Sequence, residues 1–152
     1  MTRGVTTLWD GVAVKVVWPK PTGPPPWITR NDDSVVLELS LGAVHFLLTG
    51  DIEEEAEIRL GKIPADVLKV PHHGSKSSSS PGFIAAVGPR LAIVSAGYRN
   101  RFGHPHPTVV DRFRAAGVQL YRTDRDGAVT VSTDGASVWV RTFRDEQEVR
   151  IR

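Results

Sequence analysis

Histidines and an aspartate that could carry out hydrolytic chemistry gather at three points in this 152-residue chain. Four of the five histidines fall in two short loops and one aspartate directly follows an apolar run, which gives the set Asp51, His72, His73, His104 and His106. Carboxylate and neutral imidazole are the ligands that zinc or manganese accepts where no thiolate exists, and the chain has no cysteine. Two such ions about 3.5–4 Å apart can activate a water and stabilise both the entering and the leaving oxygen at phosphorus.

The residues around the histidines favour an anionic substrate. An imidazole that does not bind metal can hold a phosphate oxygen or protonate a leaving group, and the candidates for this catalytic role are His72, His104 and His106. The next segment offers hydroxyl and ammonium groups that could bind the substrate, from Ser75, Lys76 and Ser77. The start of a helix at Pro81 could also receive an anion.

Each of these residues has a structural alternative. An aspartate between a strand and a helix, such as Asp51, is commonly only the helix N-cap. Paired histidines in a loop are commonly solvated, and His-Pro-His-Pro before a helix can simply stiffen a loop. We expect Ser77–Ser80 to be a helix cap in a solvated loop, Glu53–Glu57 to be a solvated helix face, and His45 to be a half-buried strand residue.

The segments that must position these loops alternate between strands and helices. Strands are predicted where apolar residues alternate or form short runs, over Gly11–Trp18, Ser34–Ser40, Ala43–Thr49, Ala65–Val70, Leu91–Ala96, Val118–Arg122, Ala128–Thr133 and Ala136–Phe143. Helices are predicted over Ile52–Leu60, over Pro81–Val87 and from Pro107 to Gly117. Hairpin or turn signals stand at Leu41-Gly42, Asp126-Gly127 and Asp134-Gly135.

This order predicts an α/β fold, with parallel pairing in the middle of the chain and hairpins at both ends. In an open α/β sheet the functional groups collect in the loops beyond the carboxyl ends of the strands. All three groups of candidate residues follow predicted strands in this way. The sequence therefore predicts that they meet at one edge of the sheet.

The composition is that of an ordinary globular domain. Hydrophobic residues make up 40% and charged residues 24%, which excludes a disordered or fibrous chain. No run approaches the roughly 18 apolar residues that span a bilayer. The formal charge of +2 is compatible with a polyanionic partner without requiring one. We expect a single domain over residues 1–152, with 1–10 and 144–152 peripheral and a proline-rich loop over 19–30.

Several segments together resemble a known family. The resemblance rests on LLTGDIEEEAE, ADVLKVPHHGSKSSSS, GHPHPTVVDRF and GVQLYRTDRDGAVTV, with NDDSVVLEL at Asn31–Leu39 ahead of them. In this order, over about residues 14–131, they resemble the metallo-β-lactamase-like domain at the C-terminus of the ComEC family, membrane proteins of natural competence that take up DNA. The His-His-Gly-Ser element alone would also admit other metallo-β-lactamase relatives, such as phosphorylcholine esterases.

The resemblance implies a four-layer αββα sandwich with a two-metal site between its sheets. Asp51 matches the acidic ligand that bridges the metals. His73 is favoured as the late histidine ligand, with His72 beside it near the substrate, although either could bind the metal. His104 and His106 match the late histidine loop, which lines the site and contacts phosphate. The family is thought to degrade the strand of incoming DNA that is not imported.

The chain departs from the family at its main metal motif, His-x-His-x-Asp-His, which it does not contain. Its only His-x-His is His104-Pro105-His106, and Thr108-Val109 follow where Asp-His would have to be. The chain thus resembles the second half of the domain, a partial sandwich made of a mixed sheet with helices on one face. We expect two divalent metals, zinc or manganese, in the full domain, none bound tightly by this chain, and at most weak activity of the chain alone.

The resemblance also implies partners and a location. The parent protein would bind DNA and sit in the cell membrane, with this domain outside the cytoplasm, next to the missing N-terminal half and a membrane channel region. The fragment itself would be soluble. Apolar strands such as ADVLKV and LAIVSA are typical of sheets that are buried on both faces, so an uncovered face would favour a homodimer. The alternatives are a non-catalytic module that binds DNA or oligomerises, and a sister phosphodiesterase or lactonase of the same fold.

Overall fold

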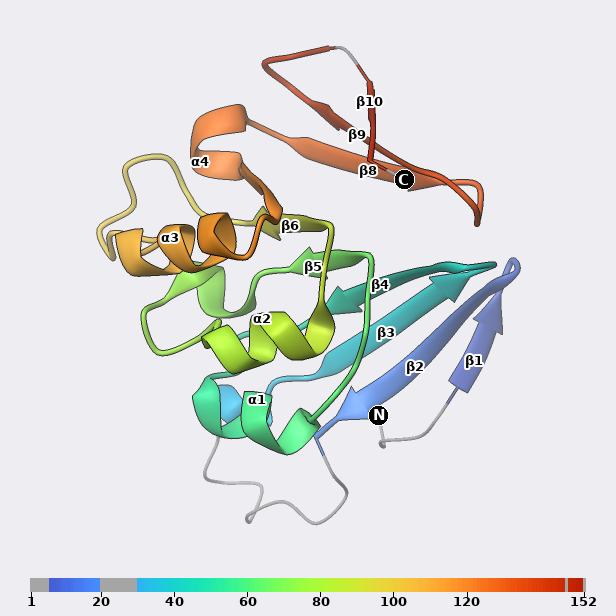
Figure 1. Cartoon of the computed structure of the whole chain (residues 1–152), viewed down its shortest axis with the longest axis horizontal. Helices are drawn as coiled ribbons and strands as arrows, with labels where there is room; N and C mark the ends of the chain where they lie inside the picture. The colour runs from blue at the N-terminus through green and yellow to red at the C-terminus, as the bar shows by residue number, and fades with distance from the viewer. Residues whose placement is uncertain (1–5, 20–29, 147, 152) are drawn as a thin grey trace.

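The computed structural model describes residues 6–19, 30–146 and 148–151, which form two sheets and a layer of helices (Figure 1). The larger sheet has seven strands in the order β1-β2-β3-β4-β5-β6-β7. Strands β1 to β4 pair antiparallel, and β4 to β7 pair parallel. The strands are β1 (Thr6–Trp9), β2 (Val12–Trp18), β3 (Val36–Leu41), β4 (Val44–Leu48), β5 (Val67–Lys69), β6 (Leu91–Val94) and β7 (Gln119–Arg122).

Tight turns join the antiparallel strands. The predicted hairpin at Leu41-Gly42 joins β3 to β4, with Gly42 at a φ of +55°. A second hairpin joins β1 to β2 through Asp10 and Gly11, whose φ angles are +52° and +85°. Positive φ at both central residues is the turn geometry that matches the twist of a hairpin. Strand β1 is not among the predicted strands, because all its residues are exposed and no apolar alternation marks them.

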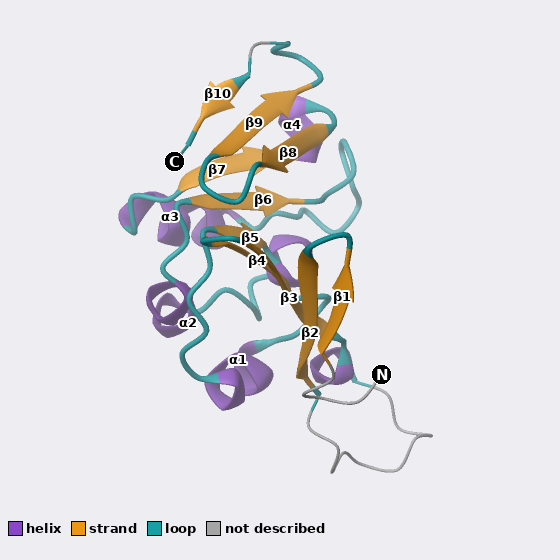
Figure 2. Cartoon of the chain, turned by 90° about the vertical axis from the view of Figure 1, so that its right-hand side faces the viewer, coloured by secondary structure: helices purple, strands orange, loops and turns teal. Residues whose placement is uncertain are grey.

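Helices make the connections in the parallel half. They are α1 (Glu54–Leu60), α2 (Pro81–Val87) and α3 (Pro107–Ala115), close to the predicted ranges. Both α2 and α3 begin at a proline. Proline lacks a backbone N–H, but the first turn of a helix has no hydrogen bond for that group, so none is lost. The hydroxyl of Ser80 accepts from the backbone N–H of Phe83 at 3.2 Å and caps α2, as predicted. Figure 2 shows the three helices along one side of the strands.

Two hydrophobic clusters cover the parallel strands, one on each face. On the first face, side chains of α1, α2 and α3 pack on the sheet, among them Ala56, Phe83 and Phe113. On the other face, Val138 and Val140 of a second sheet pack against Val44, Val67 and Leu91. The layers are therefore helices, a seven-stranded sheet and a three-stranded sheet.

The second sheet corrects one expectation. The runs ADVLKV and LAIVSA do not present a bare apolar face, because Val67 and Leu91 are 2% and 0% exposed beneath it. The chain covers these strands with its own C-terminal segment. A homodimer stays a prediction, but an uncovered apolar face on these strands no longer supports it.

The second sheet consists of β8 (Val129–Thr133), β9 (Val138–Thr142) and β10 (Val149–Arg150) in the order β10-β9-β8. The predicted turn at Asp134-Gly135 joins β8 to β9, and the Asp134 carboxylate accepts from two backbone N–H groups in it. Asp126-Gly127 ends a one-turn helix, α4 (Thr123–Asp126), through which the chain crosses from β7 to the second sheet. Within the tail, Val149 and Arg150 pair with β9.

The two sheets also meet at their hairpin tips. The backbone N–H of Ala43 donates to the carbonyl of Gly135 at 2.7 Å. A Cβ on Gly42 would stand 2.5 Å from that same carbonyl oxygen, so the close approach requires glycine.

The α/β prediction is confirmed, with a mixed sheet and helices on one of its faces. Of the predicted proline-rich loop over 19–30, residues 20–29 lie outside the described residues. Within the described part of the chain, no helix is both long and apolar enough to cross a bilayer.

Candidate active site

The three candidate loops meet at the carboxyl ends of β4, β5 and β6. The backbone N–H of His72 donates to the carbonyl of Gly50 at 3.1 Å, which ties the loop after β5 to the loop after β4. The N–H of His106 donates to the carbonyl of Gly74 at 2.8 Å, which ties in the loop after β6. The predicted meeting at one edge of the sheet is therefore present, because parallel strands end on the same side.

The two predicted metal ligands, Asp51 and His73, lie close together. Nε2 of His73 lies 3.6 Å from Oδ1 of Asp51. Nδ1 of His73 lies 2.6 Å from the carbonyl oxygen of Ser95, which can only accept, so Nδ1 carries the hydrogen in this contact. The tautomer that results leaves the lone pair of Nε2 on the side of Asp51. A backbone carbonyl behind the far nitrogen is the usual support of a metal-binding histidine.

Asp51 is not a helix cap. The N-cap of α1 is Glu53, and its side chain makes no capping hydrogen bond. Asp51 instead lies 4.0 Å from the ammonium of Lys69, which also donates to the Gly50 carbonyl at 3.0 Å. Burial lowers the pKa of Lys69, and the Asp51 carboxylate opposes that shift. Lys69 was not predicted at the site; its signal is a lone cation inside the apolar run ADVLKV.

The histidine pair lies in left-handed backbone. His72 has a φ of 47° and His73 a φ of 53°, within the short 3-10 segment Pro71–Gly74. Residues with a Cβ seldom adopt this conformation, and each instance costs on the order of 1–3 kcal/mol. Gly74 follows with a φ of +80°, and a Cβ there would stand 2.6 Å from Cβ of Pro105. The backbone thus turns through three left-handed residues to present both imidazoles.

Glu53 joins the site, contrary to the expectation of a solvated face. Its Oε1 lies 3.2 Å from Nδ1 of His72 and accepts from the Ser77 hydroxyl at 2.7 Å. The amide of Asn31 donates to the same oxygen at 3.4 Å, while the backbone N–H of Glu53 donates to Asp32 at 2.6 Å. The hydrogen bond from Ser77 is the main cause that lowers the pKa of Glu53. Glu53 therefore lies next to His72 and contacts residues 75–80, the serine loop, although Nδ1 of His72 makes no hydrogen bond within the described residues.

Glu57 also departs from the expected solvated face. It is 3% exposed and accepts from the backbone N–H groups of Ser79 and Ser80 at 2.5 Å and 2.9 Å. Burial raises the pKa of Glu57, although these hydrogen bonds oppose the shift. Ser78 and Ser79 are buried as well, at 1% and 0% exposed, so that the middle of Ser77–Ser80 is not solvated.

His104 lies beside His72 with one buried nitrogen. The two rings meet edge to face with centroids 6.0 Å apart. Nδ1 of His104 is buried and makes no hydrogen bond within the described residues. Burial, helped by the neighbouring imidazoles, lowers the pKa of His104. The ring is therefore neutral at pH 7 and still has an N–H to donate to a bound group.

The other predicted residues have different contacts. Nδ1 of His106 accepts from the backbone N–H of Thr108 at 3.2 Å and caps α3, which ties this histidine to the helix. The Ser75 hydroxyl forms a hydrogen bond with the Ser77 hydroxyl at 3.0 Å, and the Ser77 hydroxyl donates to Glu53. Lys76 is exposed. His45 is half-buried in β4, 3.3 Å from Glu38 across the hairpin, as predicted.

Asp51 and His73 fit two positions of a metal site. Ligand atoms bound to one tetrahedral ion at about 2.0–2.1 Å each stand about 3.3 Å apart, close to the observed 3.6 Å. Among residues 6–19, 30–146 and 148–151 there is no group of three or more side chains able to hold a metal ion. The described residues thus bring two of the predicted metal ligands together at this edge.

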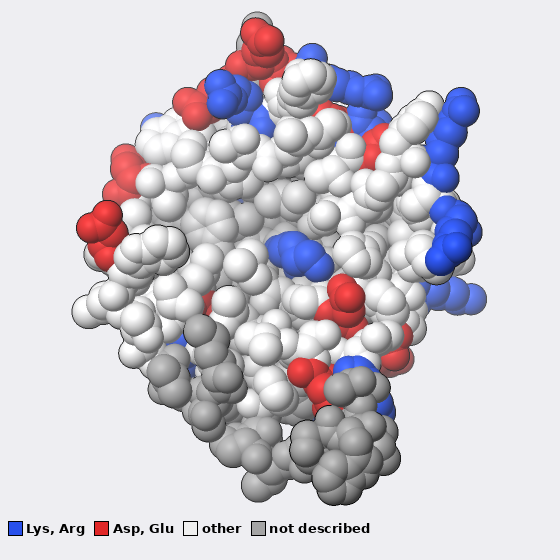
Figure 3. Space-filling model, turned by 180° about the vertical axis from the view of Figure 1, so that it is seen from behind, with Lys and Arg blue, Asp and Glu red and all other residues white. Residues whose placement is uncertain are grey.

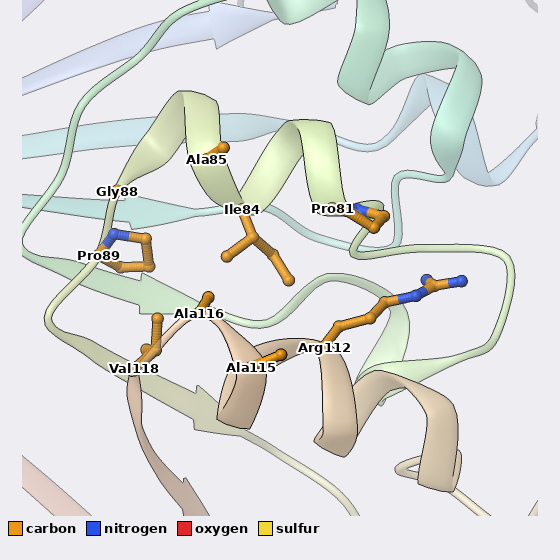
Figure 4. A pocket seen from close by; sticks show the side chains of 9 residues that line it. All are labelled: Pro81, Ile84, Ala85, Gly88, Pro89, Arg112, Ala115, Ala116 and Val118. Atoms are coloured by element: carbon orange, nitrogen blue, oxygen red, sulfur yellow. The ribbon is translucent and has the colours of Figure 1, made fainter.

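A cavity of about 540 Å³ lies away from this edge, between α2 and α3 (Figure 4). Ile84, Ala115 and Val118 give it an apolar lining. At its rim, the guanidinium of Arg112 donates to the carbonyls of Ser78 and Ser79 at 2.9 Å and 3.1 Å. Arg112 thereby fixes the serine loop to α3.

Curated proteins with similar sequences carry names from competence and recombination. The chain is 41% identical over 113 residues to ComE operon protein 3 of Bacillus subtilis, and 39% identical over 141 residues to competence protein ComA of Neisseria gonorrhoeae. It is 35% identical over 155 residues to recombination protein 2 of Haemophilus influenzae. The chain belongs to the ComEC family of competence proteins.

The ComEC-family matches take in 72%, 90% and 98% of this chain. They cover only 14%, 20% and 18% of the three relatives, so the chain spans a fifth or less of their length. No protein-family model matches the chain.

Proposed function

We propose that this chain is the second half of a metallo-β-lactamase-like nuclease domain in a ComEC-like competence protein, and that the full domain degrades the DNA strand that is not imported. The observation that carries the proposal is the meeting of Asp51, His73 and His104 at one edge of the sheet. Its support from relatives is the homology to competence proteins. The parent would sit in the cell membrane, with this domain outside the cytoplasm.

Asp51 and His73 would hold divalent metal, zinc or manganese, and the carbonyl of Ser95 would keep Nε2 of His73 free to bind. The chemistry that two such ions supply is activation of water and neutralisation of charge on the phosphate. The remaining ligands would come from the His-x-His-x-Asp-His motif of the missing half. The chain alone would therefore bind metal weakly and cleave DNA weakly or not at all.

The other residues would act on the substrate. His104 is neutral at pH 7, so its N–H suits a hydrogen bond to a phosphoryl oxygen. His72 lies next to His104, with the carboxylate of Glu53 3.2 Å from its Nδ1. Lys76 is exposed within the serine loop, where its charge can attract the DNA backbone.

The test uses the gene product that contains this chain, with end-labelled single-stranded DNA and Mn²⁺. Asp51→Asn should abolish cleavage and weaken metal binding together, because the amide loses the negative charge. His104→Ala should lower the rate by about 10²-fold or more with metal content unchanged, because it contacts substrate and not metal. Asp111→Asn is the matched control: Asp111 is exposed on α3 and pairs with Arg114, so cleavage should be unchanged.

A non-catalytic module is the second candidate. The observation that favours it is the lack of any three-ligand group in the described residues. A gene product that binds DNA without cutting it, at full Mn²⁺ or Zn²⁺ occupancy, would decide for this candidate and against the nuclease.

A further inference from the structure

The loop between β6 and α3 carries two exposed aromatic rings, each beneath an arginine. Tyr98 and Phe102 are both 68% exposed. The guanidinium carbon of Arg99 lies 5.2 Å from the centre of the Tyr98 ring, and that of Arg101 lies 4.9 Å from the centre of the Phe102 ring. Exposed aromatic rings next to guanidinium groups are what proteins use to stack on the bases of single-stranded nucleic acid and to contact its phosphates. We call residues 98–102 the aromatic loop.

Asn100 fixes the aromatic loop at its base. Its side-chain amide donates to the carbonyl of His104 at 2.6 Å and to that of Gly97 at 2.9 Å. Its carbonyl oxygen accepts from the backbone N–H of His104 at 3.0 Å. The two rings are therefore exposed on a loop that is already held in shape, which reduces the ordering that binding would require.

A row of rings leads from the aromatic loop to the candidate active site. The Phe102 ring stacks on the His104 ring, with centroids 5.9 Å apart and planes 20° apart. The His104 ring in turn meets His72 edge to face. The Phe102 ring therefore connects the aromatic loop to the histidines of the candidate active site.

The charge of this region suits a polyanion. The segment Ser95–His106 contains two arginines and no acidic residue. Figure 3 shows Lys and Arg side chains gathered along one edge of the molecule, the edge that holds α3 and the loop before it in Figure 1. Much of the rest of that face is uncharged.

We propose that the aromatic loop is a binding platform for single-stranded DNA, with bases stacked on Tyr98 and Phe102 and phosphates in contact with Arg99 and Arg101. Single strands are favoured because a duplex hides the faces of its bases. The proposal rests on the proposed function only in naming DNA and in giving the platform a use, which is to deliver one strand to His104.

The experiment measures binding without cleavage. Fluorescence anisotropy of a labelled 20-nucleotide oligothymidine is recorded with the 152-residue chain in EDTA, so that no metal-dependent step can occur. Tyr98→Ala and Phe102→Ala should each weaken binding about fivefold or more, the factor expected for loss of one base-stacking contact. Phe102→Trp should keep the affinity, because the ring face remains.

Two controls match these variants. Trp9→Ala removes another exposed ring, 77% exposed, from β1 at the opposite end of the molecule in Figure 1, and should bind as the wild type does. Arg101→Ala should lower the slope of log affinity against log salt by about 0.7, the loss of one phosphate contact. Arg59→Ala is the second control, because Arg59 of α1 also lies over an aromatic ring, that of Trp18 on β2. This variant should keep the slope of log affinity against log salt.

Two results would overturn the platform. The first is a chain that binds no oligothymidine in EDTA, or binds a duplex of the same length more tightly. The second is an unchanged affinity in both alanine variants of the loop while circular dichroism shows native folding. Because metal is absent throughout, a failure of the nuclease proposal leaves this measurement intact, and the reverse also holds.

Discussion

The parallel and antiparallel halves of the seven-stranded sheet differ in what they bury and in what they carry. In the parallel half, Val67 and Leu91 are buried under the second sheet and Leu68 is buried under the helices. In the antiparallel half, Leu8 and Trp9 of β1 are 75% and 77% exposed. Parallel strands need crossovers, and the loops that leave their carboxyl ends have room for polar side chains. The two-residue turns between antiparallel strands are too short to carry such a group of side chains. The half that holds the core therefore also holds the candidate site.

The largest effect should come from truncating the core of the parallel half. Leu68 on β5 is 0% exposed, so Leu68→Ala should lower the free energy of unfolding by about 2–5 kcal/mol. Leu8→Ala on β1 should change it by about 0.5 kcal/mol or less, because that side chain is already in water. Urea unfolding followed by circular dichroism measures both. Equal losses would remove the distinction between the halves.

The next effect should come from the contact between hairpin tips. Gly42→Ala puts a Cβ at positive φ and against the carbonyl of Gly135, which should cost about 2–3 kcal/mol. Gly117→Ala, after α3, also puts a Cβ at positive φ, but no atom lies within 4 Å of it, so this variant should cost about 1 kcal/mol. Thermal unfolding of both variants measures the two losses of stability. Their difference gives the cost of the clash with Gly135, because both variants share the cost of a positive φ. If the two losses are the same, the tips do not hold the sheets together.

A third change asks whether the second sheet unfolds with the first. Val140 is 1% exposed against the parallel strands, so Val140→Ala should cost about 2 kcal/mol. The denaturant dependence should stay a single transition, because the second sheet covers the core. Val149→Ala, at a position 40% exposed, is the control and should have little effect. A separate early transition in Val140→Ala would show that the second sheet folds by itself.

The smallest effect should be a change with pH, at the buried carboxyl that supports the serine loop. Burial raises the pKa of Glu57 above its ordinary value of 4.5, so the folded protein takes up this proton at higher pH than the unfolded chain does. The contribution of Glu57 is therefore complete at acidic pH and is lost as the pH rises through the folded-state pKa. Relative to Glu57→Gln, the wild type should gain stability as the pH falls from about 7 to about 4.5.

Urea unfolding of both proteins at the two pH values measures this gain. Glu54→Gln, on the exposed side of α1, controls for the loss of a negative charge from the same helix. A difference between wild type and Glu57→Gln that is the same at both pH values would contradict the assignment.

The features that sequence predicts here are set by neighbouring residues. Ser80 and Pro81 mark the start of α2, and Gly42 marks a hairpin, because caps and turns depend on a few adjacent residues. The meeting of Asp51 with His73 is predicted for a different reason, which is that parallel strands bring the loops at their carboxyl ends together.

The features that sequence misses depend on partners far along the chain. Glu53 and Glu57 belong to a run of acidic residues that looks solvated, and their partners in the serine loop are 22 to 24 residues away. No local pattern tells which members of such a run turn inward. His106 stays a predicted site residue, and its ring also caps α3, a second use that the motif His-Pro-His-Pro does not reveal.

The left-handed histidines have a consequence for any attempt to improve this protein. Glycine adopts their backbone angles without penalty, so His72→Gly and His73→Gly should each recover part of the strain. A library screened only for survival at high temperature should therefore accumulate glycine or asparagine at these two positions. The same library screened for function should keep both imidazoles, which makes the loop after β5 a place where heat resistance and activity select opposite residues.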